Sequence, residues 1–79
     1  MKKLLYLSNS IIPSQYANSV HVMKMCQAFK NINYDVELLC FTTEKKFSHT
    51  EVFDKYGIKN KFKIIPLYFK KNRGRFFQK

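Results

Sequence analysis

The strongest constraint on the fold is an amphipathic segment that lies between two short apolar runs. From Val20 onward, apolar side chains recur at the spacing of one helix face. The members of this stripe are Val22, Met25, Cys26, Phe29 and Ile32. One apolar stripe is typical of a helix that packs on a sheet. Asn33 follows the stripe and is predicted to end the helix, because asparagine tolerates the left-handed backbone conformation.

The apolar runs on either side of this helix are predicted to be parallel strands. Residues 3–7 are short and apolar and precede Ser8-Asn9-Ser10, so we expect a buried strand that ends there in a loop. Residues 36–41 form a second apolar run that only Glu37 interrupts. Strand, helix and strand within about forty residues is the size of one βαβ unit, whose two strands are parallel neighbours.

The segments around this unit are predicted from their turn residues and caps. Residues 11–18 mix polar and small residues with Pro13 and indicate a loop, with Asn18 or Ser19 as the helix N-cap. Residues 42–49 indicate another loop, and residues 50–56 two helical turns that Gly57 ends. A third strand over residues 62–65 is predicted to stop, or to lie at a sheet edge, at the following proline.

Charge is distributed unevenly along the chain. Fifteen lysines and arginines against five acids give a net charge of +10, and no acid follows Asp54. This basic stretch would attract anionic lipid, nucleic acid or phosphorylated ligands, or it is a solvated face whose acidic partners lie in further sequence. From Tyr68 onward aromatic residues are mixed with it, but the alternating strand pattern of an RNA-binding sheet is missing, which argues against nucleic acid.

Cysteines and hydropathy indicate a reduced, non-spanning protein. Cys26 and Cys40 lie in apolar stretches and are predicted to be reduced core residues, which suits the cytoplasm. The first residues imitate a secretory signal, but the apolar run ends at Leu7 without a cleavage site. No stretch reaches the roughly 18 to 20 apolar residues of a membrane span. We therefore expect a cytoplasmic chain, soluble or peripheral on the inner membrane face.

The loop between the first strand and the helix is the expected ligand position, because parallel α/β sheets bind ligands at the carboxyl ends of their strands. Its helix N-terminus suits anions, yet neither a dinucleotide fingerprint nor a P-loop is present. His21 is either a cleft residue or a surface residue, and His49 is expected in a loop without a partner. Scattered carboxylates and isolated serines predict no catalytic set, and no cluster of metal ligands is found.

Three segments of the first half carry a family resemblance: residues 4–7 through Pro13, residues 16–22 (YANSVHV) and residues 35–39 (DVELL). They resemble the amino-terminal end of retaining glycosyltransferases of family 4, where a strand, a proline-containing loop, a helix that opens with a histidine and a Gly-His-x-Val segment follow one another. Asn-Tyr-Asp-Val occupies that last segment here, at residues 33–36, and Ala17-Asn18 stands where many members have two glycines. The resemblance covers residues 2–41 well and the third strand loosely.

The resemblance implies the α/β class: a partial Rossmann-like parallel sheet (βαβ-α-β), the start of a GT-B amino-terminal domain. Residues 1–67 would form this domain, and residues 68–79 a basic aromatic tail. By analogy the ligand cleft would be lined by Pro13, Ala17, Asn18, Ser19 and His21. The family carries its donor-binding domain and its catalytic residues further along the chain, so no catalytic residue is assigned here.

The function implied is that of an acceptor-side fragment. The complete enzyme would transfer a sugar from a nucleotide-sugar to a glycan or a lipid-linked acceptor, and the fragment would be inactive without its missing remainder. A nucleotide-sugar belongs only to the complete enzyme, and no other cofactor or metal is expected. The alternative is a small basic module that binds an anionic membrane surface or nucleic acid. We also expect marginal stability, because a chain this short buries a thin core.

Overall fold

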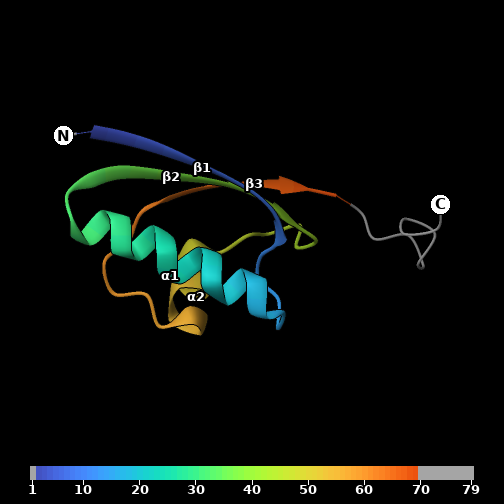
Figure 1. Cartoon of the computed structure of the whole chain (residues 1–79). Coiled ribbons are helices and arrows are strands. Elements are labelled where there is room, and N and C mark those ends of the chain that lie inside the picture. The colour runs from blue at the N-terminus through green and yellow to red at the C-terminus, as the bar shows by residue number, and fades with distance from the viewer. Residues whose placement is uncertain (1, 70–79) are drawn as a thin grey trace.

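The computed structural model describes residues 2–69 and shows a parallel sheet with both helices on one of its faces (Figure 1). The elements follow in the order β1 (Lys2–Ile11), α1 (Ala17–Asn31), β2 (Tyr34–Thr42), α2 (His49–Tyr56) and β3 (Lys63–Tyr68). The strands lie in the order β1-β2-β3, and both pairings are parallel. The chain is therefore a Rossmann-like βαβαβ domain of the α/β class, as the sequence predicts. Of the predicted basic tail, residues 70–79 lie outside the described residues.

β1 is longer than predicted, because residues 8–10 continue the strand instead of ending it. The Ser10 N–H donates to Ser8 Oγ at 3.0 Å, and the Ser8 hydroxyl donates to Ser10 Oγ at 2.9 Å. Pairing with β2 runs regularly as far as Leu7 and resumes with a shifted register at Ile11. In this irregular stretch of the strand, the serine hydroxyls thus form hydrogen bonds with each other and with the backbone N–H of Ser10, which has no register partner in β2. For this reason a polar triplet does not stop the strand.

α1 begins at Ala17, and its N-cap is Tyr16, which makes no side-chain capping bond. The prediction of Asn18 or Ser19 as the cap is therefore wrong. The Ser19 hydroxyl instead donates to the Tyr16 carbonyl oxygen at 2.8 Å, from inside the first turn. At the other end Asn33 has a φ of 72°, which confirms it as the left-handed residue that stops the helix.

The buried face of α1 differs slightly from the predicted stripe. Val22, Met23 and Cys26 are buried, so Met23 rather than Met25 faces the core. Ile32 is the C-cap residue and is 64% exposed, because the chain leaves the helix axis there. The predicted packing of the helix on the sheet is confirmed, since the buried face of α1 belongs to the same core cluster as β2 side chains.

α2 and β3 follow the predicted pattern with two differences. Gly57 has a φ of 67° and ends α2 as predicted. His49 is the first residue of α2 rather than a loop residue without a partner: its Nε2 lies 3.1 Å from the Ile64 carbonyl oxygen. β3 continues beyond Pro66, which pairs with Cys40. Within residues 2–69 β3 pairs with β2 alone, so Pro66 lies on an edge strand, where the missing N–H is tolerated.

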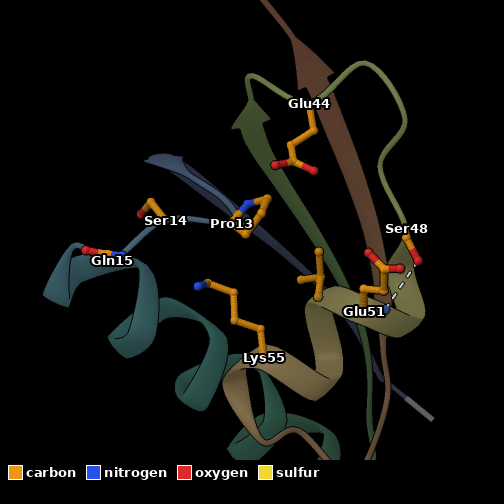
Figure 2. Close-up of a pocket in the computed structure, with 8 residues that line it drawn as sticks. Pro13, Ser14, Gln15, Glu44, Ser48, Glu51 and Lys55 are labelled. Atoms are coloured by element: carbon orange, nitrogen blue, oxygen red, sulfur yellow. Dashed lines mark hydrogen bonds between the residues drawn. The ribbon is translucent and has the colours of Figure 1, made fainter.

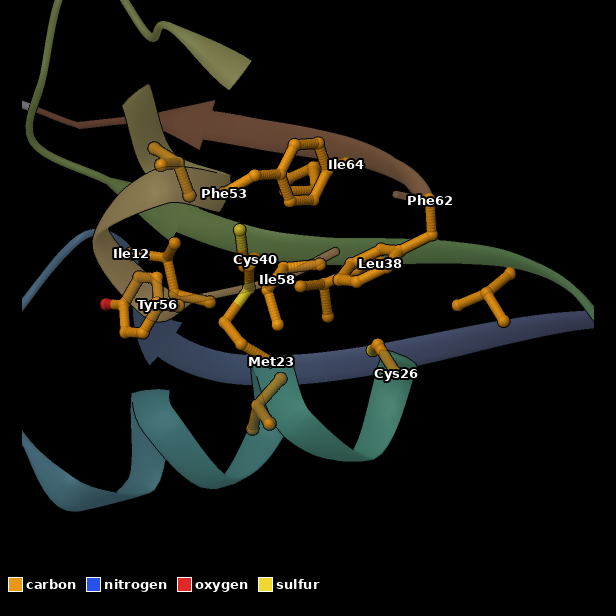
Figure 3. Packing of buried hydrophobic residues seen from close by; sticks show 13 residues of the cluster. Ile12, Met23, Cys26, Leu38, Cys40, Phe53, Tyr56, Ile58, Phe62 and Ile64 are labelled. Carbon is orange, nitrogen blue, oxygen red and sulfur yellow. The ribbon is translucent and has the colours of Figure 1, made fainter. Parts of the chain in front are cut away.

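The core lies between the sheet and the two helices (Figure 3). Leu38 and Cys40 of the central strand, Met23 and Cys26 of α1 and Ile12 after β1 are almost fully buried. Both cysteines are free, which confirms them as reduced core residues, and burial raises the pKa of Cys26 to about 12 and that of Cys40 to about 11. No helix among residues 2–69 is long and apolar enough to cross a membrane.

Candidate functional site

A polar cavity of ≈ 480 Å³ lies at the carboxyl ends of β1 and β2 (Figure 2). One wall is the loop that leaves β1, and the others are the segment after β2 and the outer side of α2. The lining residues are Pro13, Ser14, Gln15, Glu44, Ser48, Glu51, Val52 and Lys55. This is the edge at which open parallel sheets hold their ligands.

The loop wall of the cavity is held in place by Tyr56 of α2. The Ser14 N–H donates to the Tyr56 hydroxyl oxygen at 2.8 Å, and that hydroxyl lies 3.0 Å from both the Ser14 carbonyl oxygen and Ser19 Oγ. Just before it, the Ile12 N–H donates to the Phe41 carbonyl oxygen at 2.8 Å, and the Ile12–Pro13 peptide bond is cis. The loop is thereby anchored to β2 on one side and to α2 on the other.

The α2 wall begins with a capped helix end. Ser48 Oγ accepts a hydrogen bond from the Glu51 N–H at 3.3 Å. Glu51 is the acidic residue in the first turn of α2. A carboxylate there is stabilised by the helix dipole. Lys55 follows one turn later, and Figure 2 shows its amine extending across the cavity toward the loop wall. α2 therefore presents one anion and one cation to the same space.

Among residues 2–69, the charged groups of the cavity have no ion-pair partner, so each can bond a ligand. Glu44 enters from the segment after β2 and, like Glu51 and Lys55, is solvent-exposed. Within residues 2–69 none of these three groups forms an ion pair. Two carboxylates and one amine, with the Gln15 amide, can accept and donate several hydrogen bonds. The excess of carboxylates disfavours a phosphate ligand and suits a neutral ligand that carries many hydroxyl groups.

The five residues predicted for the cleft take different places. Pro13 lies in the cavity wall. Ser19 is fully buried and bonds to the loop and to Tyr56, behind the wall rather than in it. Ala17 and Asn18 are exposed in the first turn of α1, and His21 is exposed one turn later.

Most polar residues of the cavity were missed by the sequence prediction. Glu44 comes from the predicted loop of residues 42–49, and Glu51 and Lys55 come from the predicted helix of residues 50–56. No sequence pattern connects these segments to the first loop. One local signal was available: Ser48 followed by Glu51 is the S-x-x-E pattern of a helix start. It locates α2 but does not show which loop the helix faces.

Metal chemistry has no visible support in the described part of the chain. Residues 2–69 contain no group of three histidine, cysteine, aspartate or glutamate side chains placed to hold a metal ion.

A comparison with models of protein families found no match, and neither did searches of curated proteins and of solved structures. The class of the protein is therefore defined by its fold. It is a small Rossmann-like α/β domain with a three-stranded parallel sheet.

Proposed function

We propose that this chain is the acceptor-side part of a glycosyltransferase that uses a nucleotide-sugar donor. In this proposal the domain of residues 1–67 binds a hydroxyl-rich acceptor, a glycan or a lipid-linked sugar, in the cavity between the loop after β1 and α2. The donor is bound by a separate domain, so the chain alone transfers no sugar. The partner it requires is the remainder of that enzyme.

The observation that carries the proposal is the polar cavity at the carboxyl edge of the sheet. Its volume of ≈ 480 Å³ lies within the range of about 300 to 1,000 Å³ that small-molecule sites occupy. Glu44 and Glu51 can accept bonds from sugar hydroxyls, and Lys55 can donate to them. Pro13 also belongs to the segment that resembles family 4 glycosyltransferases. The resemblance and the geometry therefore point to the same loop.

The charge of the chain supports a place at a membrane surface. A net charge of +10 favours contact with the anionic inner face of a membrane, where the proposed lipid-linked acceptor would lie. We accordingly propose a cytoplasmic chain that is peripheral on this face.

Titration with small sugars, followed through the backbone amides by NMR, tests the cavity. Methyl glucoside, methyl mannoside, methyl galactoside and N-acetylglucosamine serve as acceptor probes, and UDP as the donor probe. We expect at least one sugar to shift the amide resonances of Ser14, Gln15 and Glu51. UDP should leave these resonances unshifted. If UDP shifts these amides and no sugar does, the acceptor assignment is wrong.

Paired substitutions on α2 and just after it make the same test specific. Glu51→Gln and Lys55→Met change the cavity, and Asp54→Asn and Lys59→Met change exposed residues of similar charge outside its lining. We expect each cavity variant to weaken sugar binding about tenfold or more, the loss of one hydrogen bond to a charged group. Equal affinity of cavity and control variants would show that the shifts arise elsewhere.

Binding of anionic membrane is a second candidate function. The described residues that favour it are Lys59, Lys61 and Lys63, which are exposed in succession before and at the start of β3. Sedimentation with vesicles of anionic and zwitterionic lipid tests it, because electrostatic binding falls steeply as salt rises past about 0.2 M. Absence of binding at low salt removes this candidate.

A further inference from the structure

The charged groups of the cavity are arranged with the amine apart from the two carboxylates. Figure 2 shows the Lys55 amine extending toward the wall formed by Ser14 and Gln15. The carboxylates of Glu44 and Glu51 lie away from that amine in the same view. The cavity therefore has a basic side next to the loop after β1 and an acidic side next to the start of α2.

The acidic side is not compensated from within the described part of the chain. Glu51 and Lys55 are four residues apart on α2 with the acid first, a spacing that favours an ion pair on a helix. Within residues 2–69 they form no such pair, and Glu44 forms none either. Both carboxylates are thus left to interact with whatever occupies the cavity.

Hydrogen bonds fix the backbone positions from which the two carboxylates leave the chain. Thr42, at the end of β2, is 1% exposed, and its Oγ1 accepts a bond from the Glu44 N–H at 3.1 Å. The Thr42 carbonyl oxygen accepts a bond from the Phe69 N–H at 3.0 Å, which ties the same turn to the end of β3. Ser48 holds the Glu51 N–H in a similar way. The acidic side is therefore built on backbone that the fold holds in place.

A sugar with one ammonium group complements this arrangement better than a neutral sugar. An ammonium group has three donors, whereas a hydroxyl group has one. Its hydrogen bonds to a carboxylate carry charge on both partners, and such bonds are roughly twice as strong as neutral ones. On the opposite side the Lys55 amine can donate to a sugar hydroxyl and repels a second cation. The cavity therefore favours one amine, placed on the acidic side.

The positive charge of the chain opposes cation binding, but its effect at the cavity is small. Lys45 and Lys46 follow Glu44, are exposed and do not line the cavity. Interactions between exposed charges that are further apart than about 8 Å are largely screened at physiological salt. A carboxylate that contacts the ligand is not screened in this way. The lining groups therefore decide which ligand charge is preferred.

We propose that the acceptor bound in this cavity is an amino sugar whose amine is unmodified and protonated. Glu44 and Glu51 hold the ammonium group, and Lys55 donates to a hydroxyl on the other side of the sugar. This inference rests on the proposed function, because it specifies which acceptor the cavity takes. An N-acetylated sugar, whose amide carries no charge, binds more weakly.

Matched methyl glycosides test the proposal. Each set has an amine, an acetamide or a hydroxyl group at the same ring carbon, on glucose and on galactose. They are titrated at about pH 6, where a primary amine is protonated, and followed through the amide resonances of Ser14, Gln15 and Glu51. We expect the amine of at least one set to bind at least about fivefold more tightly than its acetamide and hydroxyl counterparts, the effect of one favourable exposed ion pair.

The outcomes separate this inference from the proposed function. If the three members of each set bind equally, or the acetamide binds best, the cavity is a sugar site and the amine assignment is wrong. If no sugar binds, the proposed function fails and the inference fails with it. Both results come from the wild-type chain and need no variant to fold.

Variants of exposed residues show which groups carry the preference. The quantity compared is the ratio of amine-sugar affinity to hydroxyl-sugar affinity, so a general loss of sugar binding cancels. Glu44→Gln and Glu51→Gln should lower this ratio at least about threefold, and Lys55→Met should raise it. Asp54→Asn and Lys59→Met lie outside the lining and should leave it unchanged. A ratio that no cavity variant alters, or that falls in Lys55→Met, overturns the proposal.

Discussion

The hydroxyl oxygen of Tyr56 accepts a hydrogen bond from the backbone N–H of Ser14 at 2.8 Å, across 42 residues of sequence. This bond joins the last turn of α2 to the loop that leaves β1, the two segments that enclose the candidate acceptor cavity. The same hydroxyl reaches the Ser14 carbonyl oxygen and Ser19 Oγ. A single phenol therefore fixes one wall of the cavity relative to the other.

Replacement of Tyr56 by phenylalanine is expected to destabilise the fold. Tyr56→Phe leaves the Ser14 N–H without its partner in a partly buried loop, which costs about 1 to 3 kcal/mol. Urea denaturation followed by circular dichroism measures the loss. Tyr16→Phe is the control, because the Tyr16 side chain is 68% exposed and should lose nothing measurable. Equal stability of the Tyr56 variant and the wild-type chain would contradict the role of the hydroxyl.

Gly57 is expected to resist replacement because of its backbone conformation. Its φ of 67° is left-handed, and an added Cβ would meet Lys24 Nζ only at 3.6 Å, an ordinary contact. The cost of Gly57→Ala is therefore backbone strain of about 1 kcal/mol rather than crowding. Gly57→Asn should cost less, because asparagine tolerates this conformation. Thermal melts of both variants give the comparison, and the same loss in both would argue against strain as the cause.

The two cysteines are expected to make stability fall at alkaline pH. Burial raises the pKa of Cys26 to about 12 and that of Cys40 to about 11, above the ordinary value of 9.0. Above pH 9.0 the unfolded chain releases thiol protons that the folded chain retains, so the free energy of unfolding falls with rising pH. The contribution of the two protonated thiols to the free energy of unfolding is complete below pH 9.0. It is lost as the pH rises through the folded-state pKa values of about 11 and about 12.

Comparison with a variant that lacks both thiols isolates this effect. Urea denaturation at about pH 8 and about pH 10.5 should show a smaller loss of stability in Cys26→Ala/Cys40→Ala than in the wild-type chain. All other groups are the same in both proteins, so their effects cancel in the difference. Equal losses would show that the thiols ionise equally in the folded and unfolded states.

His49 is expected to stabilise the contact between α2 and β3. Its Nε2 lies 3.1 Å from the Ile64 carbonyl oxygen and must carry the proton that this bond requires, and its ring packs edge-on against Phe47. His49→Ala should cost about 0.5 to 1.5 kcal/mol, the usual value of one hydrogen bond. His21→Ala is the matched control on the exposed side of α1. Identical denaturation midpoints for the two variants would remove this role.

The elements that local signals define were predictable from the sequence. Asn33 and Gly57 stop their helices because their side chains, or the lack of one, permit a left-handed backbone. The start of α1 was not predictable in this way. Tyr16 offers no capping side chain, and Ser19, which resembles a cap, is held inside the helix by partners that include Tyr56 from far along the sequence.

The cavity depends even more on long-range structure. Pro13 could be placed at the carboxyl edge because the loop after a first parallel strand lies there by topology. Glu51 and Lys55 reach the same space only because α2 packs beside the loop after β1. No spacing in the sequence encodes that position of α2, since it follows from the packing of Val52 and Phe53 into the core.

The strand order has a consequence for how the protein forms during synthesis. β1, β2 and β3 lie side by side in the order in which the ribosome releases them, so each new strand joins the edge left by the preceding one. None of these three strands has to insert between two that have already paired. β1 nevertheless waits for a partner until Thr42 has emerged, because a parallel pair needs its crossover helix first. The nascent chain is therefore most open to wrong association in the interval before β2 arrives.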